Sequence, residues 1–76
     1  MTRELIEYVA RSLVDQPDSL VVTETEEDGV TIYRLKVAPR DIGKVIGRRG
    51  RVARAMRTLL KVSAIQNQTR SALEIE

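Results

Sequence analysis

The chain of 76 residues contains no cysteine, no histidine, no tryptophan and no phenylalanine. Without cysteine, neither a disulfide nor a thiolate metal site can stabilise so small a domain. Without histidine, the commonest general base near neutral pH and the commonest metal ligand are both missing. No pair of a nucleophile and a base is apparent among the remaining residues. An enzyme is therefore the least expected class, and we predict no catalytic residue, no metal site and no cofactor.

Aromatic residues are also scarce, since Tyr8 and Tyr33 are the only two. Single-strand binders that use a sheet as a platform stack bases on aromatic rings. Neither tyrosine lies in the basic part of the chain, and we expect Tyr8 at the edge of the core. Any binding of nucleic acid must then depend on phosphate contacts, an apolar groove and hydrogen bonds to base edges.

Long hydrophobic runs are missing as well. No segment is long enough to span a bilayer, and the N-terminal residues do not resemble a signal peptide. A hydrophobic content of 42% still favours a packed domain over disorder. We expect residues 1–76 to form one cytoplasmic domain, close to the lower size limit for a self-sufficient core.

Positive charge is concentrated in one part of the chain. Residues 1–39 carry a net charge of −4, residues 40–61 a net charge of +7 and residues 62–76 a net charge of −1. A domain that gathers its basic side chains on one helical unit suits a polyanion such as nucleic acid. A solvated basic helix face is the ordinary alternative.

Hydrophobic periodicity predicts six elements. In order, they are a helix over residues 3–14, strands over 19–26 and 30–37, a short helix after Pro39, a long helix over 51–66 and a strand over 71–76. Asp28-Gly29 favours a tight hairpin, because both positions tolerate positive φ. The acidic residues at this hairpin (Glu24, Glu26, Glu27 and Asp28) indicate a solvated edge rather than a catalytic carboxylate pair. Because the helix pair is long enough for a parallel crossover, we expect an α+β domain with a three-stranded mixed sheet and helices packed on one face.

The stretch from Asp41 to Leu60 is the most informative part of the sequence. It predicts two amphipathic helices separated by Gly47-Arg48-Arg49-Gly50, with Asp41 serving the start of the first. Glycine has no Cβ, so this turn can adopt dihedral angles closed to other residues and can lie close to another backbone. The second helix contributes free N–H groups and the positive end of its dipole. The combination predicts a site for a phosphate backbone beside an apolar surface.

Two glycines three residues apart are weak evidence alone, but other glycine motifs fit worse. Gly43, Gly47 and Gly50 match neither the dinucleotide-binding nor the nucleotide-triphosphate-binding pattern. A KH domain has a GXXG loop that binds the backbone of four nucleotides, and its motif resembles the run Val45-Ile46-Gly47-Arg48-Arg49-Gly50-Arg51. The element order resembles the type II KH arrangement. Over essentially its whole length, the chain is similar to the KhpA-type family of small bacterial single-KH-domain RNA-binding proteins.

The resemblance implies a non-catalytic protein that binds single-stranded RNA. Gly47 and Gly50 would let the RNA backbone approach, while Arg48 and Arg49 would contact phosphates. The remaining candidate RNA-binding residues are Lys44 and Arg51 beside the loop, Arg54 further along the basic face, and Ile42, Val45 and Ile46 in an apolar groove under the bases. For the three aliphatic residues, core packing is the alternative role.

The resemblance also implies partners and a cellular role. It implies an RNA chaperone with many transcripts, and a dimer formed with a second copy or with the larger Jag-type KH protein. In the family, that partnership is associated with control of cell elongation and division. The long helix supports an interface because its apolar residues cover more of its circumference than one small sheet needs (Met56, Leu59, Leu60, Val62 and Ile65). No small-molecule substrate and no membrane segment are expected.

Two other classes stay open on the residues alone. A DNA-binding helix-turn-helix protein also combines two helices with a glycine-containing turn, and it would prefer duplex DNA. The strands on either side of the helix pair and the double-glycine turn argue against it. An adaptor would use the basic face to dock an acidic protein or the ribosome, and it would not bind short free single strands.

Overall fold

The computed structural model describes residues 2–76. Its elements are α1 (Thr2–Leu13), β1 (Val21–Glu27), β2 (Val30–Lys36), α2 (Ile42–Ile46), α3 (Arg51–Gln66) and β3 (Arg70–Ile75). Short 3-10 turns at Pro17–Ser19, Pro39–Asp41 and Arg48–Gly50 connect them. The predicted α-β-β-α-α-β order is confirmed. Strand β1 begins two residues later than expected, because Pro17–Ser19 forms a turn of its own.

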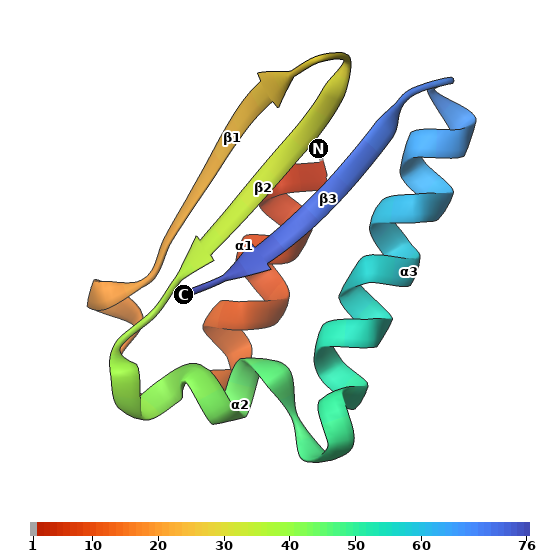
Figure 1. The fold of residues 1–76 in the computed structure, drawn as a ribbon. Coiled ribbons are helices and arrows are strands. Elements are labelled where there is room, and N and C mark those ends of the chain that lie inside the picture. The colour runs from red at the N-terminus through yellow and green to blue at the C-terminus, as the bar shows by residue number, and fades with distance from the viewer. Residues whose placement is uncertain (1) are drawn as a thin grey trace.

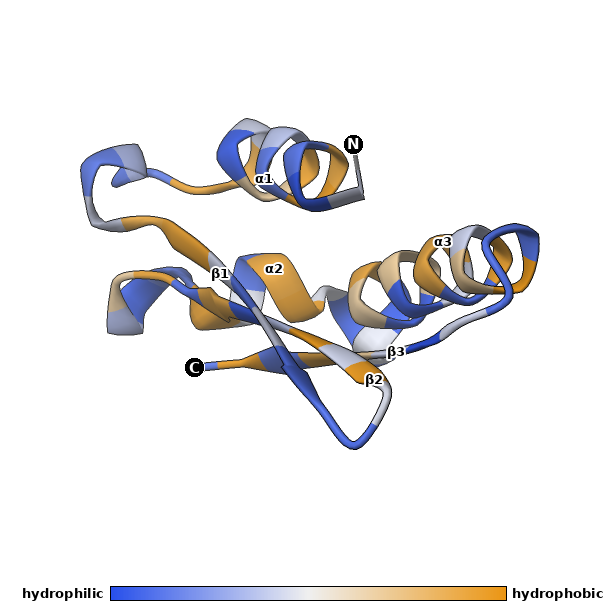
Figure 2. Cartoon of the chain, turned by 90° about the horizontal axis from the view of Figure 1, so that it is seen from above, coloured by the Kyte–Doolittle hydropathy of each residue, from blue (hydrophilic) through white to orange (hydrophobic). Residues whose placement is uncertain are grey.

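The three strands form a mixed sheet in the order β1-β2-β3. Strands β1 and β2 are antiparallel, whereas β2 and β3 are parallel and joined by the α2–α3 crossover (Figure 1). At the hairpin, Asp28 and Gly29 both have positive φ, 54° and 79°, as a type I′ turn requires. Helices α1 and α3 lie on the same side of the sheet (Figure 2). The expected mixed sheet with helices on one face is therefore confirmed.

The core fills the space between the sheet and the helices. Along β2 and just after it, Tyr33, Leu35 and Val37 are buried while Lys36 is exposed, so the strand has one buried and one exposed face. The helices contribute further buried side chains to the same cluster (Ile6 and Ala10 from α1, Val45 from α2, Met56 and Leu60 from α3). Burial of these apolar groups is the main favourable term that holds the α2–α3 unit against the sheet.

The expectation for Tyr8 is wrong, since this side chain is 72% exposed. Helix α1 turns Ile6 and Ala10 inward. Successive helical residues are about 100° apart, so Tyr8, two positions from each of them, faces away from the core. Within residues 2–76, no helix is long and apolar enough to cross a membrane.

Candidate nucleic-acid interface

The Gly47–Gly50 loop joins α2 to α3 in a tight turn. The Gly47 N–H donates to the carbonyl oxygen of Gly43 (2.9 Å), and the Gly50 N–H donates to that of Gly47 (3.0 Å). Gly47 has φ 78° and ψ 170°, a combination almost restricted to glycine. A Cβ at Gly47 would lie 2.5 Å from Cγ2 of Val52. The loop backbone is therefore packed against the first turn of α3, at a distance that excludes any side chain.

Arg49 and Gly50 both adopt the left-handed conformation, with φ of 57° and 73°. For a residue with a Cβ this conformation costs about 1–2 kcal/mol, and such strained positions cluster at binding sites and switch regions. The side chains of Arg48 and Arg49 are both exposed. The loop thus presents two guanidinium groups to solvent on a backbone whose path is fixed.

The arginines around this loop are not neutralised within the part of the chain that the structure describes. Arg48, Arg49, Arg51 and Arg54 are exposed, and none belongs to the ion pairs found there. The N-terminus of α3 adds free N–H groups and the positive end of the helix dipole at the same place. Unpaired guanidinium groups beside a helix N-terminus suit an anion such as a phosphate, which arginine can bind through two parallel hydrogen bonds.

Lys44, which was expected beside these arginines, has two acidic neighbours, Asp15 and the buried Asp41, whose Oδ1 lies 3.8 Å from the lysine Nζ. Its Nζ donates a hydrogen bond to Oδ2 of Asp15, and Nη2 of Arg40 lies 3.9 Å from the same oxygen. The hydrogen bond from Lys44, the Lys44 charge and then the Arg40 charge hold the pKa of Asp15 below its ordinary value. Asp15 is therefore ionised at neutral pH and partly neutralises Lys44.

Asp41 fixes the backbone of Asp15 relative to α2. Its side chain is completely buried and accepts hydrogen bonds from the backbone N–H groups of Asp15 (3.1 Å) and Gln16 (3.0 Å). Asp41 does occupy the N-cap position of α2, but it makes no side-chain cap hydrogen bond there. It instead ties the turn after α1 to the start of α2. Local sequence could not show this role, because the partners lie 26 and 25 residues away.

The three aliphatic candidates of α2 differ in exposure. Val45 is completely buried, Ile42 packs partly buried against the core cluster, and Ile46 is 36% exposed. Val45 and Ile42 therefore attach α2 to the core, while Ile46 offers most of the aliphatic surface of this helix.

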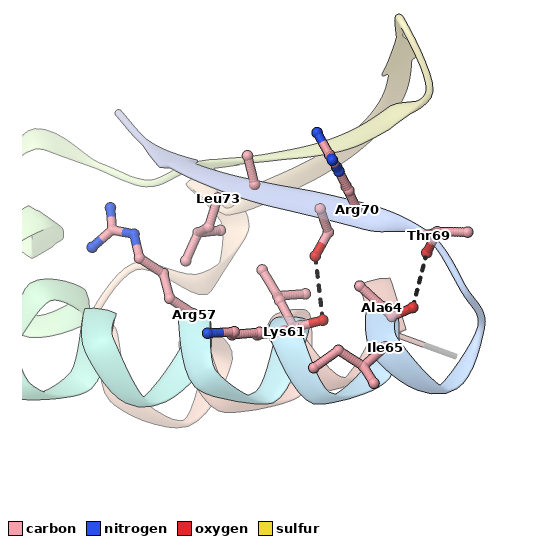
Figure 3. A pocket seen from close by; sticks show the side chains of 10 residues that line it. Arg57, Lys61, Ala64, Ile65, Thr69, Arg70 and Leu73 are labelled. Atoms are coloured by element: carbon pink, nitrogen blue, oxygen red, sulfur yellow. Dashed lines mark hydrogen bonds between the residues drawn. The ribbon is translucent and has the colours of Figure 1, made fainter.

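A groove of about 560 Å³ lies between α3 and β3 (Figure 3). Its apolar wall includes Leu60, Ala64 and Leu73, which are buried. Three cationic residues, Arg57, Lys61 and Arg70, also line it. The hydroxyl of Ser71 donates to the carbonyl oxygen of Leu60 (3.2 Å) and that of Thr69 to the carbonyl oxygen of Ala64 (3.5 Å), so β3 is fixed to α3 along the groove.

Sequence reasoning placed the apolar groove on α2 and did not foresee this one. The spacing of Arg57 and Lys61, one turn apart on α3, was a usable signal for the helical side. Arg70 gave no such signal, because its place in the groove depends on how β3 folds back beside α3.

A GXXG turn between two helices, inside an α-β-β-α-α-β chain with a mixed three-stranded sheet, defines a KH domain. The family model described as "KhpA/KhpB, KH domain" matches residues 3–75, and the chain belongs to this family.

Three bacterial relatives, each named RNA-binding protein KhpA, align along nearly the whole chain. The relative from Treponema pallidum is 56% identical over 75 residues, which cover 99% of this chain and 94% of the relative. The relative from Borreliella burgdorferi is 49% identical over 72 residues, covering 95% and 88%. The relative from Clostridium acetobutylicum is 47% identical over 73 residues, covering 96% and 97%.

Proposed function

We propose that this protein binds single-stranded RNA, without catalysis, through the Gly47–Gly50 loop. The observation that carries the proposal is the pair of exposed arginines, Arg48 and Arg49, which have no ion-pair partner within residues 2–76. They lie on a turn whose backbone is packed too tightly for a side chain at Gly47. An RNA backbone can approach such a turn closely and meet two guanidinium groups at once. The names of the relatives support RNA as the ligand.

In this proposal the phosphates run past the loop and the bases turn toward apolar surface. Arg51 and Arg54 extend the phosphate track along α3. Arg57, which also lines the α3–β3 groove, lies about 9 Å further along the helix than Arg51. Ile46, and to a smaller extent Ile42, would contact bases near the loop, and Val45 would support them from the core.

The proposal predicts modest, salt-dependent affinity with little sequence discrimination, because none of the candidate RNA-binding residues is aromatic and bases cannot stack on them. If about three to four phosphates are contacted, the slope of log K against log salt is about −2 to −3 for a single strand. Affinity should then fall about 15- to 60-fold between about 50 and 200 mM salt.

Fluorescence anisotropy of a labelled mixed-sequence single-stranded RNA tests the proposal. Wild type should bind with the stated salt dependence, and Arg48→Asp/Arg49→Asp should lose binding. The matched control is Arg3→Asp/Arg11→Asp, which makes the same change in net charge on exposed positions of α1 and should bind like wild type. Circular dichroism confirms that all three proteins are folded.

Each other outcome points to a different class. Folded wild type that binds no single strand would favour the adaptor that docks a protein or ribosomal partner. Preference for duplex DNA would favour the helix-turn-helix class. Equal binding by wild type and Arg48→Asp/Arg49→Asp would move the site away from the loop.

We further infer that a second KH-type chain covers the apolar surface between α1 and α3. A groove of about 460 Å³ separates these helices. Among the residues that line it, Tyr8 is 72% exposed, Leu59 46% and Leu13 38%, which is much apolar surface for so small a domain. Of the apolar residues that extend around the long helix, Met56 and Leu60 are buried in the core of the domain itself, which leaves the other residues for an interface.

The cellular role in this proposal rests on the family resemblance. The partner is a second copy or a Jag-type KH protein, and the role is that of an RNA chaperone acting in the cytoplasm on many transcripts. Control of cell elongation and division would follow from that post-transcriptional activity.

A further inference from the structure

The cations near the Gly47–Gly50 loop fall into two groups. Arg48 and Arg49 have no carboxylate partner in the described chain, whereas Lys44 and Arg40 share the carboxylate of Asp15. Lys44 belongs to α2, and the hydrogen bond from Gly47 N–H to Gly43 O shows that this helix runs without a break into the loop. Lys44 directly follows Gly43 and lies less than one helical turn before Gly47. The Asp15 carboxylate partly offsets its charge.

The position of Asp15 is fixed by contacts that do not involve its own side chain. The buried carboxylate of Asp41 accepts the backbone N–H groups of Asp15 and Gln16. A backbone held in this way keeps the Asp15 carboxylate close to Lys44 even though its side chain is 53% exposed. The side chain of Lys44 is 43% exposed, so both partners remain accessible to a ligand.

We propose that Asp15 competes with RNA phosphate for Lys44 and so limits how many cations reach the RNA backbone. The inference rests on the proposed function, since it concerns the same loop. An ion pair this exposed contributes little to folding, because water and salt screen it. Its effect on a polyanion is larger, because a phosphate must displace the carboxylate or share Lys44 with it before a counterion can be released.

The proposal has a quantitative consequence. Replacing Asp15 with asparagine removes the carboxylate that is hydrogen-bonded to Lys44 and leaves Asp41, whose Oδ1 lies 3.8 Å from Nζ, as its acidic neighbour within residues 2–76. Because the Asp41 carboxylate already accepts two backbone N–H groups, Lys44 becomes available for one more phosphate. The salt slope should then steepen by about 0.7. Affinity should rise about fivefold at about 0.1 M salt, which is the effect of one additional phosphate contact on a single strand.

A double-mutant cycle with a mixed-sequence single-stranded RNA tests the competition by fluorescence anisotropy. The proteins are wild type, Asp15→Asn, Lys44→Gln and Asp15→Asn/Lys44→Gln. Asp18→Asn is the matched control, because it removes the same charge three residues away from an exposed side chain outside the ion pairs of the described chain. Lys44→Gln should weaken binding less than twofold in wild type and should abolish the fivefold gain in the Asp15→Asn background.

Three results would overturn this inference alone, provided that wild type binds and Arg48→Asp/Arg49→Asp does not. They are an Asp15→Asn affinity equal to or below that of wild type, an equal gain from Asp18→Asn, and an equal loss from Lys44→Gln in both backgrounds. Absence of binding by folded wild type would overturn the proposed function itself, and this inference with it.

Discussion

Gly43 and Gly47 lie one helical turn apart and have opposite structural requirements. Gly47 has φ of 78°, and an added Cβ would meet Cγ2 of Val52 at 2.5 Å. Gly43 lies inside α2 at negative φ, and an added Cβ there would meet no atom within 4 Å. The backbone conformation therefore requires glycine at position 47, whereas position 43 would accept a residue with a side chain.

We expect Gly47→Ala to lower the free energy of unfolding by about 1–3 kcal/mol, through left-handed strain and the clash with Val52. Gly43→Ala should instead raise it by about 0.4–1 kcal/mol, because alanine restricts the unfolded chain at a compatible position. Urea denaturation followed by circular dichroism measures both. Equal effects of the two substitutions would show that the loop does not depend on the Gly47 geometry.

Local sequence was sufficient for some residues and not for others. Positive φ at Asp28, Gly29 and Gly47 could be expected from the residue types alone, because glycine, and to a smaller extent aspartate, tolerates it. All three residues have positive φ. The pairing of Asp15 with Lys44 could not be predicted, because it depends on how the turn after α1 meets α2. The sequence shows where the charged residues lie, but only the fold shows which of them form ion pairs.

At the scale of elements, Asp41 connects the end of α1 to the start of α2. Its buried carboxylate accepts two backbone N–H groups from the turn after α1. Hydrogen bonds to a charged acceptor are stronger than neutral ones, so this one side chain helps to fix the relative position of the two elements.

We expect Asp41→Ala to lower the free energy of unfolding by about 2–3 kcal/mol, because both N–H groups lose a charged acceptor. Asp18→Ala, at an exposed position in the same turn, should change it by less than about 0.5 kcal/mol. Thermal and chemical denaturation of both variants provide the measurement. A mild effect at Asp41 would mean that water satisfies the two N–H groups and that other contacts position α2.

The elements themselves were largely predictable. The predicted helix over residues 51–66 coincides with α3, and the predicted strand over 71–76 corresponds to β3, shifted by one residue. Each of these elements can be predicted from the spacing of apolar residues within its own segment. The α3–β3 groove depends instead on the crossover that places two segments side by side, and no single segment encodes it.

At the scale of the whole molecule, the exposed apolar surface between α1 and α3 predicts self-association or pairing with a related chain. We expect equilibrium sedimentation at roughly tens of micromolar to show a dimer, and Leu59→Glu to give a folded monomer, because a buried unpaired carboxylate is costly at an interface. A monomeric variant should bind a one-site RNA like wild type and a two-site RNA more weakly, since the avidity of paired domains is lost.

The matched control for this test is Thr58→Glu, which adds the same charge at the neighbouring exposed position of α3. It should remain dimeric. Wild type that sediments only as a monomer would contradict a homodimer, and mixing with a Jag-type KH protein would then test the heterodimer.

The acidic hairpin and the Gly47–Gly50 loop lie at opposite ends of the molecule (Figure 1), whose longest extent is 35 Å. Because charges of opposite sign lie at the two ends, the whole domain has a permanent electric dipole moment. Near a long polyanion, this moment produces a torque that turns the basic loop forward before any contact is made. The torque acts over about 10 Å at 0.1 M salt and further in dilute buffer. If the protein binds RNA as proposed, the hairpin takes part in the encounter by being repelled.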